Sequence, residues 1–294
     1  MIGRLAILGV GLIGGSVALA LKRAGQVARV VGHGRNRANL DEALSRGVID
    51  EIAESPETAV AGADVVLLAM PVGGMAAAFA RIAPHLAAHA LVTDAGSTKQ
   101  DVIAAARAGL GSRIGRFVPA HPIAGAEKSG AAAARADLYA GRNVILTPLP
   151  ENAAADVAAV AGLWRACGAQ TVEMTASGHD GVFAAVSHLP HLAAFALVDE
   201  LASRPQAQTY FRHAGSGFRD FTRIAGSSPE MWRDIALANR EALTAELDAY
   251  LSRLSAYRDA LAAGDADTLM QSFIRASEAR SRWQPNGNNI ENDE

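Results

Sequence analysis

The first 174 residues alternate short apolar runs with longer segments in which apolar residues recur every three or four positions. Short apolar runs are typical of strands buried on both faces of a parallel sheet, and the periodic segments are typical of helices. The pattern predicts strands at residues 5–8, 29–32, 65–70, 91–94, 117–119, 143–146 and 170–173. It predicts helices at residues 13–24, 38–46, 73–85, 99–108 and 153–167. This alternation indicates an α/β fold with a doubly wound sheet, largely parallel at its start.

After about residue 174 the strand pattern stops, and the chain up to Arg282 predicts only helices. The longest helix is expected from about Glu230 to Ala263, ending near Gly264. Leucines along it recur at helical spacing and form one apolar stripe: Leu243, Leu247, Leu251, Leu254 and Leu261. Part of the stripe must face the core of this all-helical region. The remainder favours packing against a second copy of the chain, as a homodimer.

A glycine-rich turn joins the first predicted strand to the first predicted helix. Gly9, Gly11 and Gly14 have the G-x-G-x-x-G spacing inside the strand–turn–helix unit that gives this motif its meaning. Gly9 permits the tight turn, Gly11 lets the backbone approach a pyrophosphate, and Gly14 allows close packing of the helix. The first amides of the helix, at Leu12 and Ile13, are then placed to bind phosphate oxygens. The turn therefore predicts a dinucleotide site.

The end of the second predicted strand bears on which nicotinamide cofactor binds. NAD-binding domains place a carboxylate about 20 residues after the glycines, where it binds the ribose 2′-hydroxyl. Residues 31–37 read VGHGRNR and contain no carboxylate, and Arg35 and Arg37 flank its expected place. A guanidinium suits a 2′-phosphate, so NADP is favoured, with NAD as the alternative. The alternative is that Arg35 and Arg37 belong to a solvated basic loop without a role in cofactor binding.

Composition and domain pattern narrow the class of protein. We expect a dinucleotide-binding domain at residues 1–174, a helical substrate and dimerisation domain at 175–284, and a disordered tail at 285–294. The net charge of -3 lacks the basic excess that nucleic-acid binding needs. The single cysteine, Cys167, favours a reducing compartment. We expect no membrane span, no metal site and a cytoplasmic location.

Three further segments carry side chains that can perform chemistry. The first, TDAGSTK, follows a strand, and its Ser97 either faces a ligand at the end of the sheet or caps the next helix. The second, HPIAGAEKSG, begins at His121 and also follows a strand. The third lies in the helical half and consists of SHLPHL, GFRDFTRIA and Trp232.

In this order, the segments HPIAGAEKSG, SHLPHL and GFRDFTRIA resemble the prephenate and arogenate dehydrogenase family of tyrosine biosynthesis. The resemblance runs through the chain up to about Trp283. It implies a Rossmann-type domain, a helical dimerisation domain and an active site in the cleft between them. It also implies oxidative decarboxylation of a cyclohexadienol to a 4-hydroxyphenyl product, with prephenate and arogenate both open as substrates.

The resemblance also implies roles for single residues. His121 would accept the proton of the ring hydroxyl, which suits a neutral imidazole at cellular pH, and Ser97 would help to orient both groups. Arg223 would bind a substrate carboxylate through its planar guanidinium. Arg219, four residues earlier, would present to the same face of a helix, although family members often carry lysine there.

Other residues receive weaker roles. His188 and His191 are expected to line the cleft, with capping or packing as the alternative for one of them. Glu127 is implied in gating or polar contacts near the substrate, with a surface salt bridge as the alternative. Trp232 is expected to bind substrate by reaching the site of the partner subunit, with core packing as its alternative. The remaining histidines are expected to be structural: His33, His85, His89, His179 and His213.

Two other functions fit part of the sequence. One is another NAD(P)-dependent dehydrogenase of the same architecture, acting on small hydroxy acids or imines. That reading predicts a catalytic lysine in the helical domain, where this chain has SHLPHL. The other is a non-catalytic nucleotide sensor, which would not need His121, Ser97 and Arg223 together.

Overall fold

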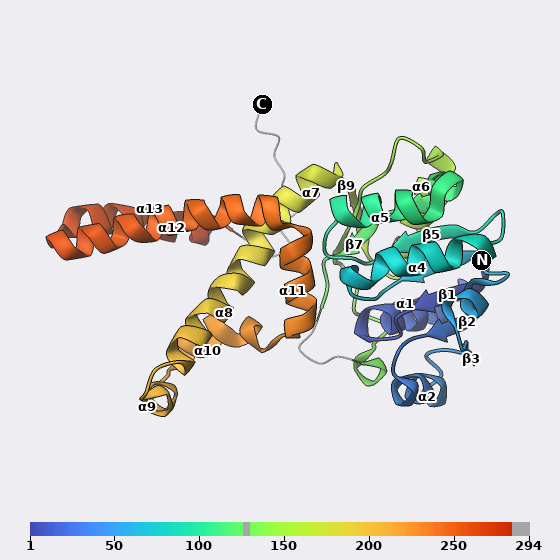
Figure 1. Ribbon diagram of the computed structural model, residues 1–294, viewed down its shortest axis with the longest axis horizontal. Coiled ribbons are helices and arrows are strands. Elements are labelled where there is room, and N and C mark those ends of the chain that lie inside the picture. The colour runs from blue at the N-terminus through green and yellow to red at the C-terminus, as the bar shows by residue number, and fades with distance from the viewer. Residues whose placement is uncertain (126–129, 284–294) are drawn as a thin grey trace. The chain divides into compact units, whose positions relative to one another are not determined.

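A parallel sheet of six strands forms the centre of the amino-terminal part of the protein (Figure 1). The computed structural model describes residues 1–125 and 130–283, and the chain forms two compact units, residues 1–243 and 244–294. The sheet has the order β3-β2-β1-β4-β5-β6, which is the strand order of a Rossmann fold. Its strands are β1 Ile2–Leu8, β2 Val27–His33, β3 Glu51–Ile52, β4 Val65–Leu68, β5 Leu91–Asp94 and β6 Phe117–Val118.

Helices cover both faces of this sheet, because side chains along each strand alternate between them. On β1, Leu5 and Ile7 join one apolar cluster, whereas Ala6 and Leu8 join the other. The first cluster takes side chains from α1 Leu12–Arg23, α2 Arg37–Ser45 and α6 Ala154–Ala166. The second takes side chains from α3 Pro56–Val60, α4 Met75–Ile82 and α5 Gln100–Leu110. The predicted doubly wound sheet is therefore confirmed.

A second, smaller sheet follows the first along the chain. It consists of β7 Ala120–Pro122, β8 Asn143–Leu146 and β9 Gln170–Glu173, with β7 antiparallel to β8 and β8 parallel to β9. The strands at β8 and β9 were predicted, but not that they leave the main sheet. The short elements β3, β7 and α3 were not predicted, because segments of so few residues contain too little periodicity.

The chain after β9 is helical in its described residues, as predicted. The first unit continues with α7 Ala176–Phe183, a π-helical turn at Ala184–His188, α8 Leu189–Ala202, α9 Ala207–Arg212, α10 Ser216–Thr222, a 3₁₀ turn at Arg223–Gly226 and α11 Pro229–Ala238. α12 Arg240–Ala263 begins in the first unit, and α13 Ala266–Arg282 belongs to the second. The expected boundary at residue 174 stays a prediction.

The expectation of one helix from Glu230 to Ala263 is wrong. The helix is interrupted at Asn239, which separates α11 from α12. The Asn239 side chain is buried and donates hydrogen bonds to the Asp180 carbonyl and to Nδ1 of His188. These contacts hold the break, since a buried amide without partners would cost free energy. α12 then ends at Ala263, before Gly264 with its φ of +67°, as predicted.

Much of the apolar surface of the helical part is exposed in the single chain. The continuous helical stretch Ala176–Ala202 contains an 18-residue window of mean hydropathy 1.6 and is long and apolar enough to cross a membrane by length and composition alone, contrary to expectation. The mostly buried core helix of a soluble protein passes the same test, and 22% of this window is buried. Within this stretch His179, Asp180 and His188 are buried and hydrogen-bonded inside the first unit. Such buried polar contacts are typical of a packed domain.

The predicted leucine stripe divides between the two units. Leu243 is buried in the first unit, whereas Leu251, Leu254 and Leu261 of the second are exposed. In the second unit α12 and α13 run side by side (Figure 1), and Tyr257 packs edge-on against Phe273 with ring centroids 5.8 Å apart. The exposed leucines leave an apolar face on this helical pair.

Candidate active site

The turn between β1 and α1 has the backbone that a dinucleotide needs. Gly9 has a φ of +103°, and a Cβ there would lie 2.3 Å from the Ala69 carbonyl oxygen. A Cβ at Gly14 would lie 2.4 Å from the Gly9 carbonyl oxygen. At Gly11, the N-cap residue that precedes α1 and has no side chain to cap it, a Cβ would meet no atom within 4 Å. The turn thus fits a pyrophosphate beside Gly11 and the amides of Leu12 and Ile13.

The two arginines after β2 differ in their surroundings. Arg37 is already engaged by two carboxylates, with its Nε 2.9 Å from Asp41 and its Nη1 3.1 Å from Glu54. Arg35 is 81% exposed, and its nearest carboxylate, that of Glu230, lies 3.6 Å away. Arg35 is therefore the better placed of the two to bind an anionic ligand.

A buried ion pair ties the end of β5 to β7. Lys99 is fully buried, and its ammonium group donates to the Asp94 carboxylate and, at 2.8 Å, to the Ala120 carbonyl. The other oxygen of Asp94 accepts the amide of Ala120 at 2.9 Å. Because Ala120 precedes His121 on β7, this pair fixes the backbone from which the His121 side chain projects.

The amino terminus of α5 is capped from outside its own segment. The Asp180 carboxylate on α7 accepts the amides of Lys99 and Gln100, each at 2.8 Å. A carboxylate at a helix N-terminus satisfies unpaired amides and complements the helix dipole. Lys99, not Ser97, is the N-cap residue of α5. The alternative that Ser97 caps α5 is therefore wrong.

His121 lies at the head of a row of polar side chains. Its Nδ1 is 2.8 Å from Nε2 of His179, and Nδ1 of His179 is 2.8 Å from Oδ1 of Asp180. The Phe183 ring packs edge-on against His121 at 5.0 Å. Burial, reinforced by His179, Lys99 and His188, lowers the pKa of His121 well below the usual histidine value. His121 is therefore a neutral imidazole at cellular pH.

His179 was expected to be structural, and the structure places it in direct contact with His121. Burial lowers the pKa of His179, against the opposing effect of its hydrogen bond with Asp180. Although burial raises it, hydrogen bonds from His179, Gln100 and Lys99 hold the pKa of Asp180 below its usual value. The sequence has no local signal for this contact, because 58 residues separate the two histidines.

His188 lies at the end of the π-helical turn between α7 and α8. Pro190 has no amide hydrogen and its ring crowds the carbonyl four residues earlier, so a regular α-helix is interrupted here. The His188 ring is buried, and its Nδ1 accepts a hydrogen bond from the Asn239 amide at 3.1 Å. Burial lowers its pKa to about 4, and the charge of Asp180 and, to a smaller extent, a hydrogen bond to the Ser97 backbone oppose that shift. His188 thus supports the Ser97 segment as a neutral side chain.

His191, Trp232 and Arg223 lie near one another, and the Trp232 ring also meets the His188 ring edge-on at 6.1 Å. The Trp232 ring stacks on His191 with centroids 3.6 Å apart, and Nδ1 of His191 lies 2.9 Å from the Ser187 carbonyl. Burial lowers the pKa of His191, and the charge of Arg223 lowers it further. The indole N–H of Trp232 is buried and has no hydrogen-bond partner among the described residues. These three side chains form an aromatic and cationic group suited to a carboxylated ring.

Two predicted site residues are not part of that group. Arg219 is 78% exposed on α10, with its Nε 3.6 Å from the Asp220 carboxylate. Glu127 lies outside the described residues. No cluster of three or more histidine, cysteine or acidic side chains that could hold a metal ion occurs in the part of the chain that the structure describes.

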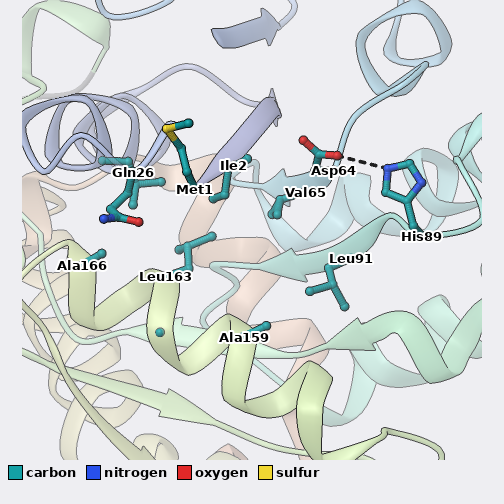
Figure 2. Close-up of a pocket in the computed structure, with 12 residues that line it drawn as sticks. Met1, Ile2, Gln26, Asp64, Val65, His89, Leu91, Ala159, Leu163 and Ala166 are labelled. Atoms are coloured by element: carbon teal, nitrogen blue, oxygen red, sulfur yellow. Dashed lines mark hydrogen bonds and ion pairs between the residues drawn. The ribbon is translucent and has the colours of Figure 1, made fainter. Parts of the chain in front are cut away.

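A depression of about 510 Å³ lies at the opposite edge of the main sheet (Figure 2). It is lined by residues at the amino ends of the strands, including Ile2, Val65 and Leu91, and by α6. In Figure 2, Nε2 of His89 is joined to Asp64 at 3.1 Å. Ligands of doubly wound sheets bind at the carboxyl ends of the strands, where the glycine turn and Asp94 lie. The depression is therefore separate from the candidate active site.

Comparison with known proteins agrees with this geometry. Residues 17–173 match the family model for the nucleotide-binding domain of prephenate dehydrogenase, and residues 175–275 match the model for its dimerization domain. A cyclohexadienyl dehydrogenase from Zymomonas mobilis is 36% identical over 94% of each chain. A prephenate dehydrogenase from Bacillus subtilis is 38% identical over 92% of this chain and 74% of its own.

Among solved structures, a prephenate dehydrogenase from A. aeolicus in complex with hydroxyphenyl propionate and NAD+ has a TM-score of 0.88 to this structure. The two sequences are 35% identical, and the match covers 96% of this chain and 98% of the other. Both family models and both relatives lead to the same conclusion. This chain belongs to the prephenate dehydrogenase family.

Proposed function

We propose that this protein oxidises and decarboxylates prephenate or arogenate, with hydride transfer to NAD(P), in tyrosine biosynthesis. The observation that carries the proposal is His121, a neutral imidazole whose Nδ1 lies 2.8 Å from Nε2 of the buried His179 and whose ring packs against Phe183. Family membership supports the reaction class. A sensor without catalysis would have no use for a base held in this way.

The reaction requires the protein mainly to position the substrate and the cofactor and to provide one proton acceptor. A nicotinamide bound at the glycine turn would take the hydride from C4 of the ring. His121 takes the proton of the C4 hydroxyl, and Ser97 orients that hydroxyl against the imidazole. The ring carboxylate leaves as CO2, and aromatisation of the ring drives its loss. The residues therefore act mainly by holding the substrate in a reactive position.

The substrate is a dicarboxylate, so its site must supply cationic and hydrogen-bonding groups. Arg223 is assigned to a substrate carboxylate, with the Trp232 N–H and the His191 ring as neighbouring contacts. His188 is assigned to supporting the Ser97 segment rather than to contact with substrate. Arg219 and Glu127 stay candidates for the outer part of the pocket.

For the cofactor we propose a preference for NADP over NAD, carried by Arg35. Residues 31–37, at the end of β2 and just after it, include no carboxylate that could bind a ribose 2′-hydroxyl. Arg35, in the same segment, is exposed. Arg37 contributes less, because Asp41 and Glu54 already occupy its guanidinium. A 2′-phosphate would give Arg35 a strong, charge-assisted partner.

We also propose that the protein is a cytoplasmic homodimer, with residues 1–174 binding the cofactor and 175–284 binding substrate and forming the dimer. The match to a dimerization domain supports this assembly. So do the exposed apolar side chains on the helices, such as Val186, Leu237 and Leu261. The buried free thiol of Cys167 supports a reducing compartment. Sedimentation at twice the chain mass is expected, and a monomer at micromolar concentration would contradict the dimer.

The function is tested by following reduced nicotinamide by absorbance with prephenate and arogenate, each paired with NADP and with NAD. Turnover with at least one pair is expected, and the pattern assigns both the substrate and the cofactor. No turnover with any of the four pairs, while cofactor binding persists, would leave a non-catalytic nucleotide sensor or another dehydrogenase as the explanation. Small hydroxy acids and imines, assayed in parallel, separate those two.

A further inference from the structure

The row His121–His179–Asp180 is ordered by one group whose hydrogen-bonding role is unambiguous. Oδ1 of Asp180 accepts the Lys99 amide, and Oδ2 accepts the Gln100 amide, each at 2.8 Å. A carboxylate that caps backbone amides is ionised and can only accept hydrogen bonds. Nδ1 of His179, 2.8 Å from Oδ1, must therefore carry a hydrogen and donate it to Asp180.

That assignment propagates along the row. Burial lowers the pKa of His179, so its ring is neutral, and its single hydrogen is the one on Nδ1. Nε2 of His179 then has a lone pair and can only accept. Nδ1 of His121, 2.8 Å away, must be the donor, which leaves the lone pair of His121 on Nε2.

We propose that His179 and Asp180 act as positioning residues, which hold His121 as the Nδ1–H tautomer so that its Nε2 is the proton acceptor of the site. The inference rests on the proposed function only for the identity of the proton that Nε2 accepts. His121 gains one proton on Nε2 when the substrate hydroxyl loses it, and its Nδ1–H bond to His179 stays in place. The resulting cation is stabilised by the neutral His179 ring and, behind it, the negative charge of Asp180.

The surroundings of the row show why it is needed. The charged and titratable groups that act on His121 are His179 from α7, Lys99 before α5 and His188 from the π-helical turn, and each lowers its pKa. None of these groups offers a negative charge to a protonated His121. Asp180 supplies that charge through His179, and Asp94, paired with Lys99, adds a smaller contribution at His179.

The first test reads the tautomer directly. In 15N-histidine-labelled protein near pH 7.5, we expect the Nδ1 of His121 to have the shift of a protonated ring nitrogen and Nε2 that of an unprotonated one. The chain has 8 histidines, and the His121→Asn variant assigns the signals by their loss. A proton on Nε2 of His121 in the wild-type protein would overturn the proposal, whatever the substrate proves to be.

The second test uses two amides that replace opposite ends of the His179 ring. His179→Gln places an amide where Nε2 lies and can still accept from His121, whereas His179→Asn keeps a donor to Asp180 only. We expect kcat about 10²–10⁴-fold lower in the Asn variant with KM unchanged, and partial rescue in the Gln variant. The matched control is His89→Asn, which breaks the His89–Asp64 pair at the far edge of the sheet (Figure 2).

The outcomes of the second test are decisive in both directions. Equal kcat and an equal pH profile in wild type and the Asn variant would overturn the positioning role. Equal losses in the Asn, Gln and His89→Asn variants would also overturn it, because they would report general destabilisation. If the wild-type protein turns over none of the four substrate and cofactor pairs, the proposed function fails, and the nitrogen shifts alone judge the tautomer.

Discussion

At the scale of single residues, the site depends on imidazoles that the fold keeps neutral. His121, His179 and His188 are each partly or fully buried, and burial is the main cause of the lowered pKa in all three. A neutral ring can accept a proton, whereas a ring that is already charged cannot. The low pKa values therefore keep the base available at neutral pH and below it.

Replacing His121 by asparagine removes the proton acceptor while keeping a polar side chain at that position. We expect turnover to fall by roughly 10²–10⁴, as for loss of a general base. Cofactor affinity should barely change, because the glycine turn is untouched. Steady-state kinetics and a cofactor titration measure the two effects, and near-normal turnover would remove His121 from the chemistry.

Replacing Arg35 by alanine tests the source of cofactor preference. We expect NADP binding to weaken more than NAD binding, since only NADP offers a 2′-phosphate to the guanidinium. Dissociation constants for both cofactors measure the difference. Arg37→Ala is the control, because Asp41 and Glu54 engage that guanidinium. Equal weakening of both cofactors by Arg35→Ala would contradict the phosphate assignment.

At the scale of elements, two nearby glycines in the turn from β1 to α1 have different roles, one in the fold and the other in ligand binding. Gly9 is needed by the fold, because its φ is +103° and a Cβ would collide with the Ala69 carbonyl. Gly11 has open space where its Cβ would be, so the fold itself does not need a glycine there. A requirement for glycine at position 11 would therefore come from a ligand.

The variants Gly11→Ala and Gly9→Ala should accordingly behave differently. Gly11→Ala is expected to leave the free energy of unfolding nearly unchanged while weakening cofactor binding at least several-fold. Gly9→Ala is expected to destabilise the fold, because alanine would be strained at this φ and would clash. Urea unfolding and cofactor titration on both variants check the contrast. Unchanged cofactor binding in Gly11→Ala would contradict close approach of the pyrophosphate.

At the break between α11 and α12, one residue both ends a helix and contacts residues near the site. Asn239 interrupts the helix and at the same time donates to His188 and to the Asp180 carbonyl. Periodicity along the chain predicts one continuous helix there, since the apolar positions keep their spacing across the break. The interruption depends on acceptors more than 50 residues away in the sequence, which a local pattern cannot reveal.

At the scale of the whole molecule, the buried histidines make the fold sensitive to acid. In the unfolded chain a histidine binds a proton as the pH falls below about 6.5. The folded protein keeps His188 neutral until about pH 4. Stability from this residue is therefore complete above the unfolded pKa and is lost as the pH falls from about 6.5 towards 4.

We expect the free energy of unfolding to decline over that interval by roughly 3 kcal/mol from His188 alone, with further loss from His121 and His179. Urea titrations at several pH values between 4 and 8 measure it. His188→Asn should flatten the dependence, even if it lowers stability at pH 8. The exposed His213 gives the control, and His213→Asn should have the dependence of the wild type. A flat wild-type profile would contradict the linkage.

What the sequence could predict follows from how local each feature is. The sheet, the glycine turn and the helical second half come from patterns within about 20 residues, and these predictions are confirmed. The three segments HPIAGAEKSG, SHLPHL and GFRDFTRIA, taken together, identified the family. The contacts around His121 could not be found in this way, because His179 is 58 residues from His121 and Asp180 is 81 residues from Lys99, whose amide it caps.

The π-helical turn at Ala184–His188 has a consequence for comparing related chains. Such a turn contains one residue more than a regular helical turn, and each residue of an α-helix advances by about 100°. A chain one residue shorter between Phe183 and His188 would relax to an ordinary helix and rotate the His188 ring away from Asn239. A single-residue gap at this place in an alignment would therefore mark homologues that support the Ser97 segment by other means.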